Sequence, residues 1–353
     1  MTVPLNSEPA RISAVATAVP EFALHQSDVV ARATEIFAPD VPDFDRFAPV
    51  YANAGVATRY SCVPLDWYGR PHSFTERNDL YIENAVALLE QVAGSLLDQV
   101  EMTTDDIDAL VVISTTGMAT PSLDALLIER MALRRDVERL PVFGLGCAGG
   151  VTGLTRAAQL ARSRPGTRVM LLVVELCGLT FQANDTAKSN IISTALFGDG
   201  AAGALVQCGG EGPVIVDGAE HTWPNSLDVM GWSFGENGLG VKLSRDVPGF
   251  VREHLPAPAA AFLGCNGLTL ADIDHHICHP GGGKVLDALE DVLGLAPGDL
   301  AASRAVMRDY GNMSAATALF VLKESIARAP SGRFLMSALG PGFTASFALL
   351  EAE

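Results

Sequence analysis

The stretch Gly146-Cys147-Ala148-Gly149-Gly150 decides the fold, because a similar stretch, Gly311-Asn312-Met313-Ser314-Ala315, recurs 165 residues later (312 − 147). Each stretch begins a helical pattern that ends at a turn containing Pro and Arg. An apolar run of strand length follows each turn, at residues 169–174 and 334–338. Repetition at a constant spacing indicates a duplicated structural unit. We therefore predict two similar halves, at residues 1–210 and 211–353.

A second repeated pair supports this division. Asp106-Ile107-Asp108 and Asp272-Ile273-Asp274 each precede a short run that we expect to be a strand, at an offset of 166 (272 − 106). Residues 141–145 and 168–174 form further apolar runs, and residues 76–100 show apolar positions near the 3.6-residue period of a helix. Apolar strands separated by helices predict an α/β fold whose sheets are buried on both faces.

The composition excludes several classes of protein. Hydrophobic residues make up 48% of the 353 residues and charged residues only 18%, which is too apolar for a disordered chain. The net charge of −17 disfavours nucleic acid, whose phosphates need a basic surface. The longest apolar run stops at Glu175, well short of the ~20 residues of a membrane helix. The N-terminus has no basic leader and the six cysteines form no disulfide or zinc framework, so we expect a soluble, cytoplasmic protein.

Three residues are candidates for chemistry. Cys147 and Asn312 occupy matching positions at predicted helix starts, so packing of the halves about a pseudo-twofold axis would bring them to one cleft. His279 ends a predicted strand just before Gly281-Gly282-Gly283 and could join them. A helix N-terminus and a nearby imidazole both favour the reactive thiolate of cysteine. Amide groups beside the glycines could bind an oxyanion.

Each of these residues also has an ordinary structural explanation. A cysteine is most often a small buried apolar residue, and Asn312 alone is a good helix N-cap. His276, Cys278 and His279 could suggest a metal site, but alternate residues of a strand face opposite sides, so the three cannot converge on one ion. The repeat and the neighbouring glycines favour a reactive Cys147. The alternation of side chains along the strand argues against a metal site.

Five motifs spread over essentially the whole chain resemble, in the right order, those of type III polyketide synthases, the chalcone synthase family. They are Gly146-Cys147-Ala148-Gly149-Gly150, Leu196-Phe197-Gly198-Asp199-Gly200-Ala201-Ala202, His279-Pro280-Gly281-Gly282, Gly311-Asn312-Met313-Ser314 and Gly340-Pro341-Gly342. The resemblance implies the thiolase fold, in which a duplicated α/β unit forms a five-layered αβαβα sandwich, and it implies a homodimer.

The resemblance also implies a role for each candidate. Cys147 would take the acyl group of an acyl-CoA starter and hold the growing chain as a thioester. His279 and Asn312 would stabilise the enolate that forms when malonyl-CoA loses CO₂, which two neutral hydrogen-bond donors can do. Coenzyme A thioesters are then the substrates, and no metal or redox cofactor is needed.

Further positions follow from the resemblance. Phe197 matches a gatekeeper between the coenzyme A tunnel and the cavity, and Val241 aligns with a second one. Cys177 and Thr180 fall among residues that line the substrate cavity, and a small residue at position 177 is associated with a tunnel for long acyl chains. A chain of net charge −17 needs a local basic rim to hold coenzyme A. The expected contacts are Arg59, Gly281, Gly282 and Lys284, with Lys242 as a weaker candidate, and residues 116–121 match a segment that crosses the dimer interface.

These expectations define a leading function and two alternatives. We expect an iterative polyketide synthase that extends a long acyl-CoA starter with malonyl-CoA to an alkylpyrone or alkylresorcinol. The initiating β-ketoacyl-ACP synthase of fatty acid synthesis shares the fold and the Cys-His-Asn set, although there His is typically followed by Gln-Ala-Asn rather than by Pro280-Gly281-Gly282. A non-catalytic thiolase-like partner protein is the second alternative.

Overall fold

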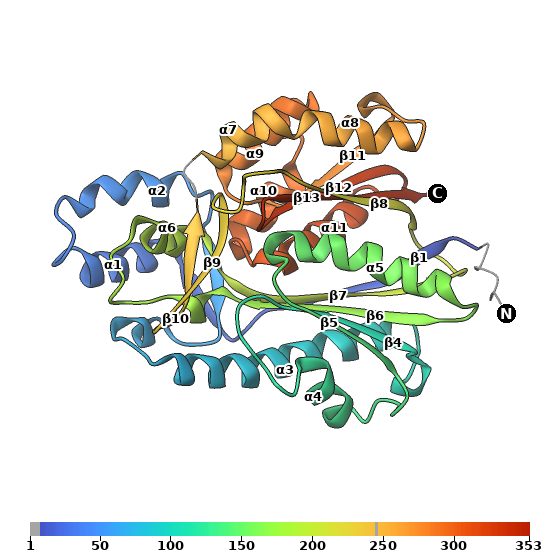
Figure 1. Ribbon diagram of the computed structural model, residues 1–353, viewed down its shortest axis with the longest axis horizontal. Helices are drawn as coiled ribbons and strands as arrows, with labels where there is room; N and C mark the ends of the chain where they lie inside the picture. The colour runs from blue at the N-terminus through green and yellow to red at the C-terminus, as the bar shows by residue number, and fades with distance from the viewer. Residues whose placement is uncertain (1–7, 244–245) are drawn as a thin grey trace.

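The computed structural model describes residues 8–243 and 246–353. Within them, nine strands form a sheet in the order β11-β12-β13-β8-β1-β7-β6-β4-β5. Their bounds are β1 Ala10–Ala18, β4 Ala109–Ile113, β5 Glu138–Val142, β6 Arg168–Leu176, β7 Asp199–Cys208, β8 Val214–Thr222, β11 His275–Cys278, β12 Gly332–Gly340 and β13 Thr344–Ala352. β1 and β8 pair only near one end, at Arg11 and Val214. The strands on either side of that junction therefore diverge into two layers (Figure 1).

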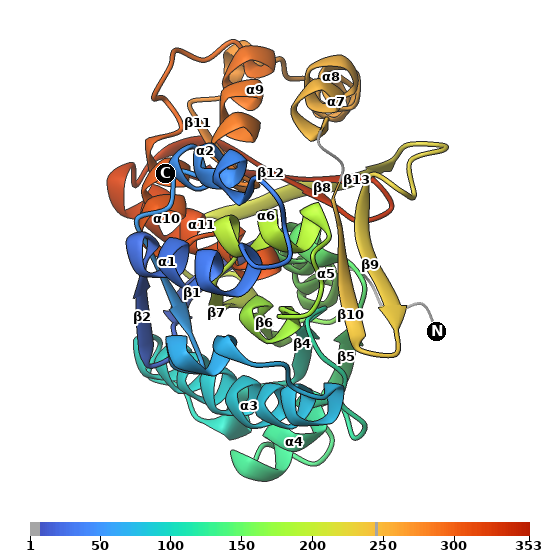
Figure 2. The ribbon, with the colours of Figure 1, turned by 90° about the vertical axis from the view of Figure 1, so that its left-hand side faces the viewer.

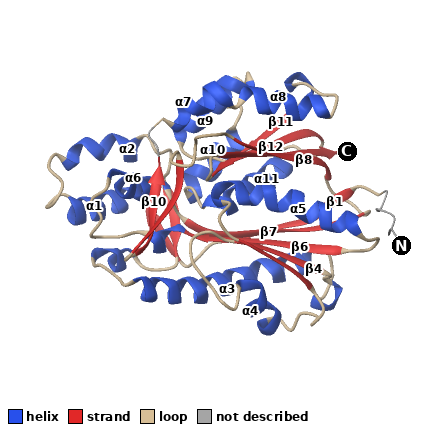
Figure 3. Cartoon of the chain, in the orientation of Figure 1, coloured by secondary structure: helices blue, strands red, loops and turns tan. Residues whose placement is uncertain are grey.

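Helices complete a five-layered sandwich (Figures 1 and 3). α5 and α11 lie between the two layers of strands, α3 and α4 cover one outer face, and α7, α8 and α9 cover the other. These helices are α3 Phe74–Gln99, α4 Leu123–Arg130, α5 Gly149–Ser163, α7 Val247–His254, α8 Pro256–Cys265, α9 Gly283–Leu293 and α11 Thr317–Arg328. The predicted αβαβα thiolase-like architecture is confirmed.

The remaining elements surround one end of the sandwich (Figure 2). They include a small hairpin, β9–β10, which belongs to neither layer of the main sheet. The elements are β2 Phe22–His25, α1 Gln26–Phe37, α2 Ala48–Ala52, β3 Thr58–Ser61, α6 Lys188–Leu196, β9 Met230–Gly235, β10 Gly238–Leu243 and α10 Ala301–Tyr310. They form most of the walls of the site described below.

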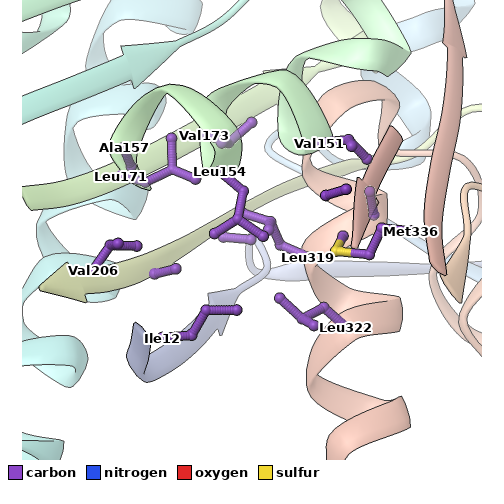
Figure 4. Close-up of a cluster of buried hydrophobic side chains, with 14 of the residues drawn as sticks. Ile12, Val151, Leu154, Ala157, Leu171, Val173, Val206, Leu319, Leu322 and Met336 are labelled. Carbon is purple, nitrogen blue, oxygen red and sulfur yellow. The ribbon is translucent and has the colours of Figure 1, made fainter. Parts of the chain in front are cut away.

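Small residues let the two central helices approach closely. A Cβ at Gly150 in α5 would lie 2.3 Å from the backbone oxygen of Ala315, so only glycine fits there. Leu154 of α5 and Leu319 and Leu322 of α11 are fully buried in one apolar cluster between the sheet layers (Figure 4). Burial of such side chains contributes about 1.5–3 kcal/mol each, so this helix pair fixes how the two halves meet.

The duplication is visible element by element. β4, α5, β6 and β7 correspond to β11, α11, β12 and β13. The short 3₁₀ turns before β4 and β11 each have a capping box of the same kind. The carboxylate of Asp106 accepts from Thr103 in the first, and that of Asp272 accepts from Thr269 in the second. The chain is therefore built from two similar halves.

One detail of the predicted repeat was wrong. α5 begins at Gly149 and α11 at Thr317, an offset of 168 (317 − 149), and the preceding 3₁₀ turns Gly146–Ala148 and Ser314–Ala316 keep that offset. Cys147 therefore corresponds to Ala315 and not to Asn312. The difference arises because Asn312 first pairs with Phe197 as an isolated bridge, before the chain turns into the helix.

The expected strand at residues 141–145 is also displaced. β5 covers Glu138–Val142 and lies at the edge of the sheet, with only β4 beside it. Leu140 and Phe143 are exposed, because no further strand or helix of the described chain covers this edge. Within the described residues, no helix has both the length and the apolar character needed to cross a membrane.

Candidate active site

Cys147, the predicted nucleophile, lies in a tight 3₁₀ turn, Gly146–Ala148, directly before α5. Gly146 adopts φ +48°, and a Cβ there would come within 2.6 Å of the Pro341 ring. Only glycine combines that conformation with that contact. Cys147 is only 8% exposed, so the turn presents it to a cavity rather than at the surface.

Asn312 and His279 reach the same cavity from the second half. The Asn312 backbone is held by two hydrogen bonds, from its N–H to Leu196 O at 2.8 Å and from Gly198 N–H to its own carbonyl at 3.0 Å. Its side-chain Oδ1 accepts from Ser314 N–H at 2.8 Å. His279 follows β11, and its backbone N–H donates to Ser337 O at 2.8 Å. The three predicted residues thus line one cavity of about 760 Å³.

The buried surroundings keep both reactive groups neutral. Burial raises the pKa of the Cys147 thiol to about 12, although hydrogen bonds with Ser314 and Asn312 oppose the shift. Burial lowers the pKa of His279 to about 3. Neither ring nitrogen of His279 has a hydrogen-bond partner within the described residues. Both shifts have the same cause, because transfer from water disfavours the charged forms of a thiol and of an imidazole.

A chain of hydrogen bonds connects the thiol to a buried carboxyl group that the sequence motifs did not select. Cys147 Sγ donates to Ser314 Oγ at 3.7 Å, and Ser314 donates to Glu175 Oε1 at 3.4 Å. Glu175 also accepts from Thr115 N–H at 3.0 Å and from the Thr116 hydroxyl at 2.9 Å. In the sequence, the only sign of Glu175 is that it is a charged residue at the end of the longest apolar run.

Burial raises the pKa of Glu175 to about 7, with the hydrogen bonds from Thr115, Thr116 and Ser314 opposing the shift. A glutamate in the unfolded chain releases its proton near its ordinary pKa of 4.5, whereas the folded state holds the proton up to about pH 7. The stability that this group contributes is therefore present at low pH and is lost as the pH rises from 4.5 through about 7.

We therefore expect the free energy of unfolding of Glu175→Gln, relative to that of the wild type, to rise by about 2 to 3 kcal/mol as the pH is raised from 5 to 8. Urea unfolding at the two pH values measures this difference. Glu324→Gln, a surface change on α11, is the matched control and should show no such gain. If the unfolding free energies of Glu175→Gln and the wild type differed by the same amount at both pH values, Glu175 would not be a buried carboxyl group that keeps its proton.

The other predicted contacts are divided between two cavities. The cavity of about 760 Å³ that Cys147, His279 and Asn312 line is called the catalytic cavity. It is also lined by Val241, Gly281, Gly282 and Lys284, and by the weaker candidate Lys242. Cys177 lines a second, mostly apolar cavity of about 80 Å³, and Phe197 lines both. Thr180 lines neither cavity, and its hydroxyl donates to Cys177 O at 2.7 Å.

The structure does not bring Arg59 to the rim with Lys284. Arg59 is buried, and its guanidinium donates to the carbonyls of Thr194, Ala195 (3.1 Å) and Phe197 (3.0 Å) at the end of α6. These donors satisfy carbonyls that a helix end leaves without intrahelical partners. Arg59 is thus engaged in the fold, while Arg46 and Lys188, which no sequence motif indicated, do line the catalytic cavity.

A buried thiol, imidazole and amide that meet between two duplicated α/β halves define a condensing enzyme of the thiolase fold. The chain belongs to the chalcone and stilbene synthase family: the family's N-terminal domain model matches residues 4–210 and its C-terminal domain model matches residues 215–350. It is thus a type III polyketide synthase and an acyltransferase. This membership favours a polyketide synthase over the two alternatives that the sequence left open.

Individual relatives agree with the family. The chain is 38% identical to a 1,3,6,8-tetrahydroxynaphthalene synthase of Streptomyces peucetius, over 96% of this chain and 92% of that protein. It is 28% identical to the α-pyrone synthesis polyketide synthase-like protein Pks18 of Mycobacterium tuberculosis, over 96% and 90%. The crystal structure of the tetrahydroxynaphthalene synthase of Streptomyces coelicolor, a bacterial type III polyketide synthase, matches with a TM-score of 0.93 and 28% identity, over 97% and 99%.

Proposed function

We propose that this enzyme loads an acyl-CoA starter onto Cys147 and extends it repeatedly with malonyl-CoA by decarboxylative Claisen condensation. The observation that supports this best is the cavity of about 760 Å³ that Cys147, His279 and Asn312 line together. A nucleophile next to two neutral hydrogen-bond donors suits acyl transfer followed by stabilisation of an enolate.

In the loading step, a ring nitrogen of His279 accepts the Cys147 proton while the sulfur attacks the thioester carbonyl of the starter. The bond from Sγ to the acyl carbon forms, and the bond to the coenzyme A sulfur breaks. The proton then passes from His279 to the departing coenzyme A thiolate. His279 returns to the neutral form, which its burial favours.

In the extension step, malonyl-CoA loses CO₂ and the electron pair of the broken C–C bond passes to the thioester oxygen. His279 N–H and Asn312 Nδ2 donate to that oxygen. Because Asn312 Oδ1 is held by Ser314 N–H, the amide orientation is fixed with Nδ2 as the remaining donor. The enolate carbon then attacks the Cys147 thioester, and Sγ leaves as a thiolate that takes up a proton from solvent. The product is a coenzyme A thioester that is longer by two carbons, and it reloads Cys147 as in the loading step before the next extension.

The apolar second cavity supports a long starter. Cys177 and Phe197 line it, together with apolar residues of α1 such as Val29, Ala33 and Phe37. Apolar walls favour an alkyl chain by about 0.8 kcal/mol per buried CH₂. We infer that a fatty acyl chain extends into this cavity from the Cys147 thioester, and that the product closes to an alkylpyrone or alkylresorcinol.

We infer that the coenzyme A moiety is held in the same cavity as Cys147. Lys284, Lys188 and Arg46 line the catalytic cavity and supply the positive charge that its phosphates need. Gly281 and Gly282 form the turn beside Lys284, where the absence of side chains lets the pantetheine arm approach the backbone.

We also infer a cytoplasmic homodimer. Met118, Leu140 and Phe143 are large apolar side chains exposed in the loop before α4 and along the edge strand β5. An uncovered edge strand beside exposed apolar groups is suited to pairing with a second copy. The described residues contain six cysteines and no disulfide, as in a reducing compartment. Sedimentation that gives only monomer at micromolar concentration would contradict the dimer.

Mass spectrometry of products tests the function directly. The purified enzyme is incubated with malonyl-CoA and with acyl-CoA starters of increasing chain length. We expect cyclised polyketides that retain the starter alkyl chain, formed faster from long than from short starters. A requirement for malonyl-ACP with a single condensation, or products confined to short aromatic starters, would overturn the proposal.

Cys177→Phe should shorten the accepted starter, because the ring fills the entrance to the apolar cavity. Each methylene that no longer fits loses about 0.8 kcal/mol, so exclusion of two lowers kcat/KM for long starters by roughly 10-fold. Short starters should be turned over as before. Cys177→Ala is the matched control and should keep the long-chain preference, and an equal loss for all chain lengths would argue against an acyl channel at this position.

A further inference from the structure

The β9–β10 hairpin forms one wall of the catalytic cavity without being part of the main sheet. Its two strands pair only with each other in the described chain. Trp232 from β9 and Val241 and Leu243 from β10 line the cavity. Because no neighbouring strand of the main sheet fixes this wall, the position of the hairpin depends on other contacts.

The turn of the hairpin rests on the first turns of α3 (Figures 1 and 2). Gly238 adopts φ +83°, and a Cβ there would lie 2.3 Å from the Phe74 ring. One turn further along α3, Arg77 Nη2 donates to Asn237 O in the hairpin turn. Gln182 adds a second connection, since its Nε2 donates to Leu239 O at 2.9 Å.

The same guanidinium also holds the turn that begins at Cys177 and lines the second, apolar cavity. Arg77 Nη1 donates to Leu179 O at 3.3 Å and to Phe181 O at 3.4 Å. These carbonyls flank Thr180 in the turn that begins at Cys177. α3 packs against the main sheet through a long buried face, so it is a rigid reference for both the hairpin and this turn.

Arg77 is an unusual cation for its location. It is buried, yet no Asp or Glu forms an ion pair with it within residues 8–243 and 246–353. Its acceptors are three backbone carbonyls, and its Nε has no partner there. Desolvation of a charge is costly, and a planar fork is what allows one side chain to hold two segments at a fixed separation.

We propose that Arg77 is a positioning residue that holds the β9–β10 wall of the catalytic cavity in place against α3 and the turn at residues 177–181, and thereby sets the number of malonyl units added. This inference rests on the proposed function, because extension number has meaning only for a polyketide synthase. With the hairpin held in place, extension stops when the growing chain fills the catalytic cavity that the hairpin lines. A loosened hairpin leaves room for further extension.

Hydrogen exchange of the free enzyme tests the structural half of this proposal without any substrate. In Arg77→Met, amides of β9 and β10 should exchange at least 10-fold faster, while those of β6 and β7 stay protected. Gln182→Leu, which removes only the second connection, should accelerate the same amides less, and it serves as the test should Arg77→Met fail to fold. Arg328→Met on the α11 surface is the matched control. Unchanged protection of the hairpin in both Arg77→Met and Gln182→Leu would overturn the proposal.

Product analysis tests the functional half. With one fixed starter, the ratio of products with one additional malonyl unit to the wild-type product should rise at least threefold in Arg77→Met, while Cys147 is acylated at a rate within twofold of wild type. Arg77→Lys keeps the charge but not the fork, so it should shift the ratio in the same direction. A loosened hairpin with an unchanged ratio, or wild-type behaviour of Arg77→Lys, would overturn the assignment to Arg77. If the wild-type enzyme makes no polyketide, the proposed function fails, and the exchange measurement still decides whether Arg77 holds the hairpin.

Discussion

Cys147→Ala is expected to lower polyketide formation by at least about 10⁴-fold, because the starter can no longer be held as a thioester. Intact-protein mass spectrometry after incubation with acyl-CoA alone should show one added acyl group on the wild type and none on the variant. Release of CO₂ from malonyl-CoA should persist in the variant, since His279 and Asn312 remain. This pattern would separate loss of the nucleophile from loss of the fold.

The control for this variant is Cys265→Ala, an exposed cysteine at the end of α8. It should be acylated at Cys147 and form product as the wild type does.

Alkylation of Cys147 by iodoacetamide should accelerate about tenfold per pH unit from pH 7 to pH 10, because the pKa of the buried thiol is raised to about 12 and only the thiolate reacts. A plateau near pH 7, or product from Cys147→Ala at the wild-type rate, would contradict these roles.

Asn312→Leu is expected to show the reverse pattern, with Cys147 still acylated and decarboxylation of malonyl-CoA reduced by about 10²- to 10³-fold. Loss of one preorganised donor to an oxyanion typically has an effect of that size. The measurement is CO₂ release from malonyl-CoA, followed separately from acylation in the mass spectrum. Equal losses of acylation and decarboxylation would indicate a structural role for Asn312.

A second variant distinguishes the donor from the fold at this position. Asn312 Oδ1 accepts from Ser314 N–H, a contact that leucine removes and aspartate keeps. Asn312→Asp should therefore keep the local structure while losing the Nδ2 donor and adding a charge that opposes the enolate. Its decarboxylation rate should be at least as low as that of Asn312→Leu. Recovery of decarboxylation in Asn312→Asp would show that the amide donor is dispensable.

The sequence by itself determined the architecture and the composition of the reactive set. The repeated motifs predicted two similar halves because a duplicated unit keeps its spacing of turns, helices and strands along the chain. The helix expected at residues 76–100 is α3, Phe74–Gln99, and the strand expected after Asp108 is β4, which begins at Ala109. Cys147, His279 and Asn312 were selected by position and motif, and they line one cavity.

Only the tertiary structure decided the surroundings of that set. The neutral state of Cys147 and His279 results from burial by segments distant in sequence, which no local pattern records. The contact of Ser314 with Glu175 and the capping of α6 by Arg59 likewise join residues more than 130 positions apart. The position of the hairpin wall depends on the contact between Arg77 and Asn237, 160 residues apart. Periodicity specifies each element and its buried face, whereas the partners across a cavity exist only once the elements have packed.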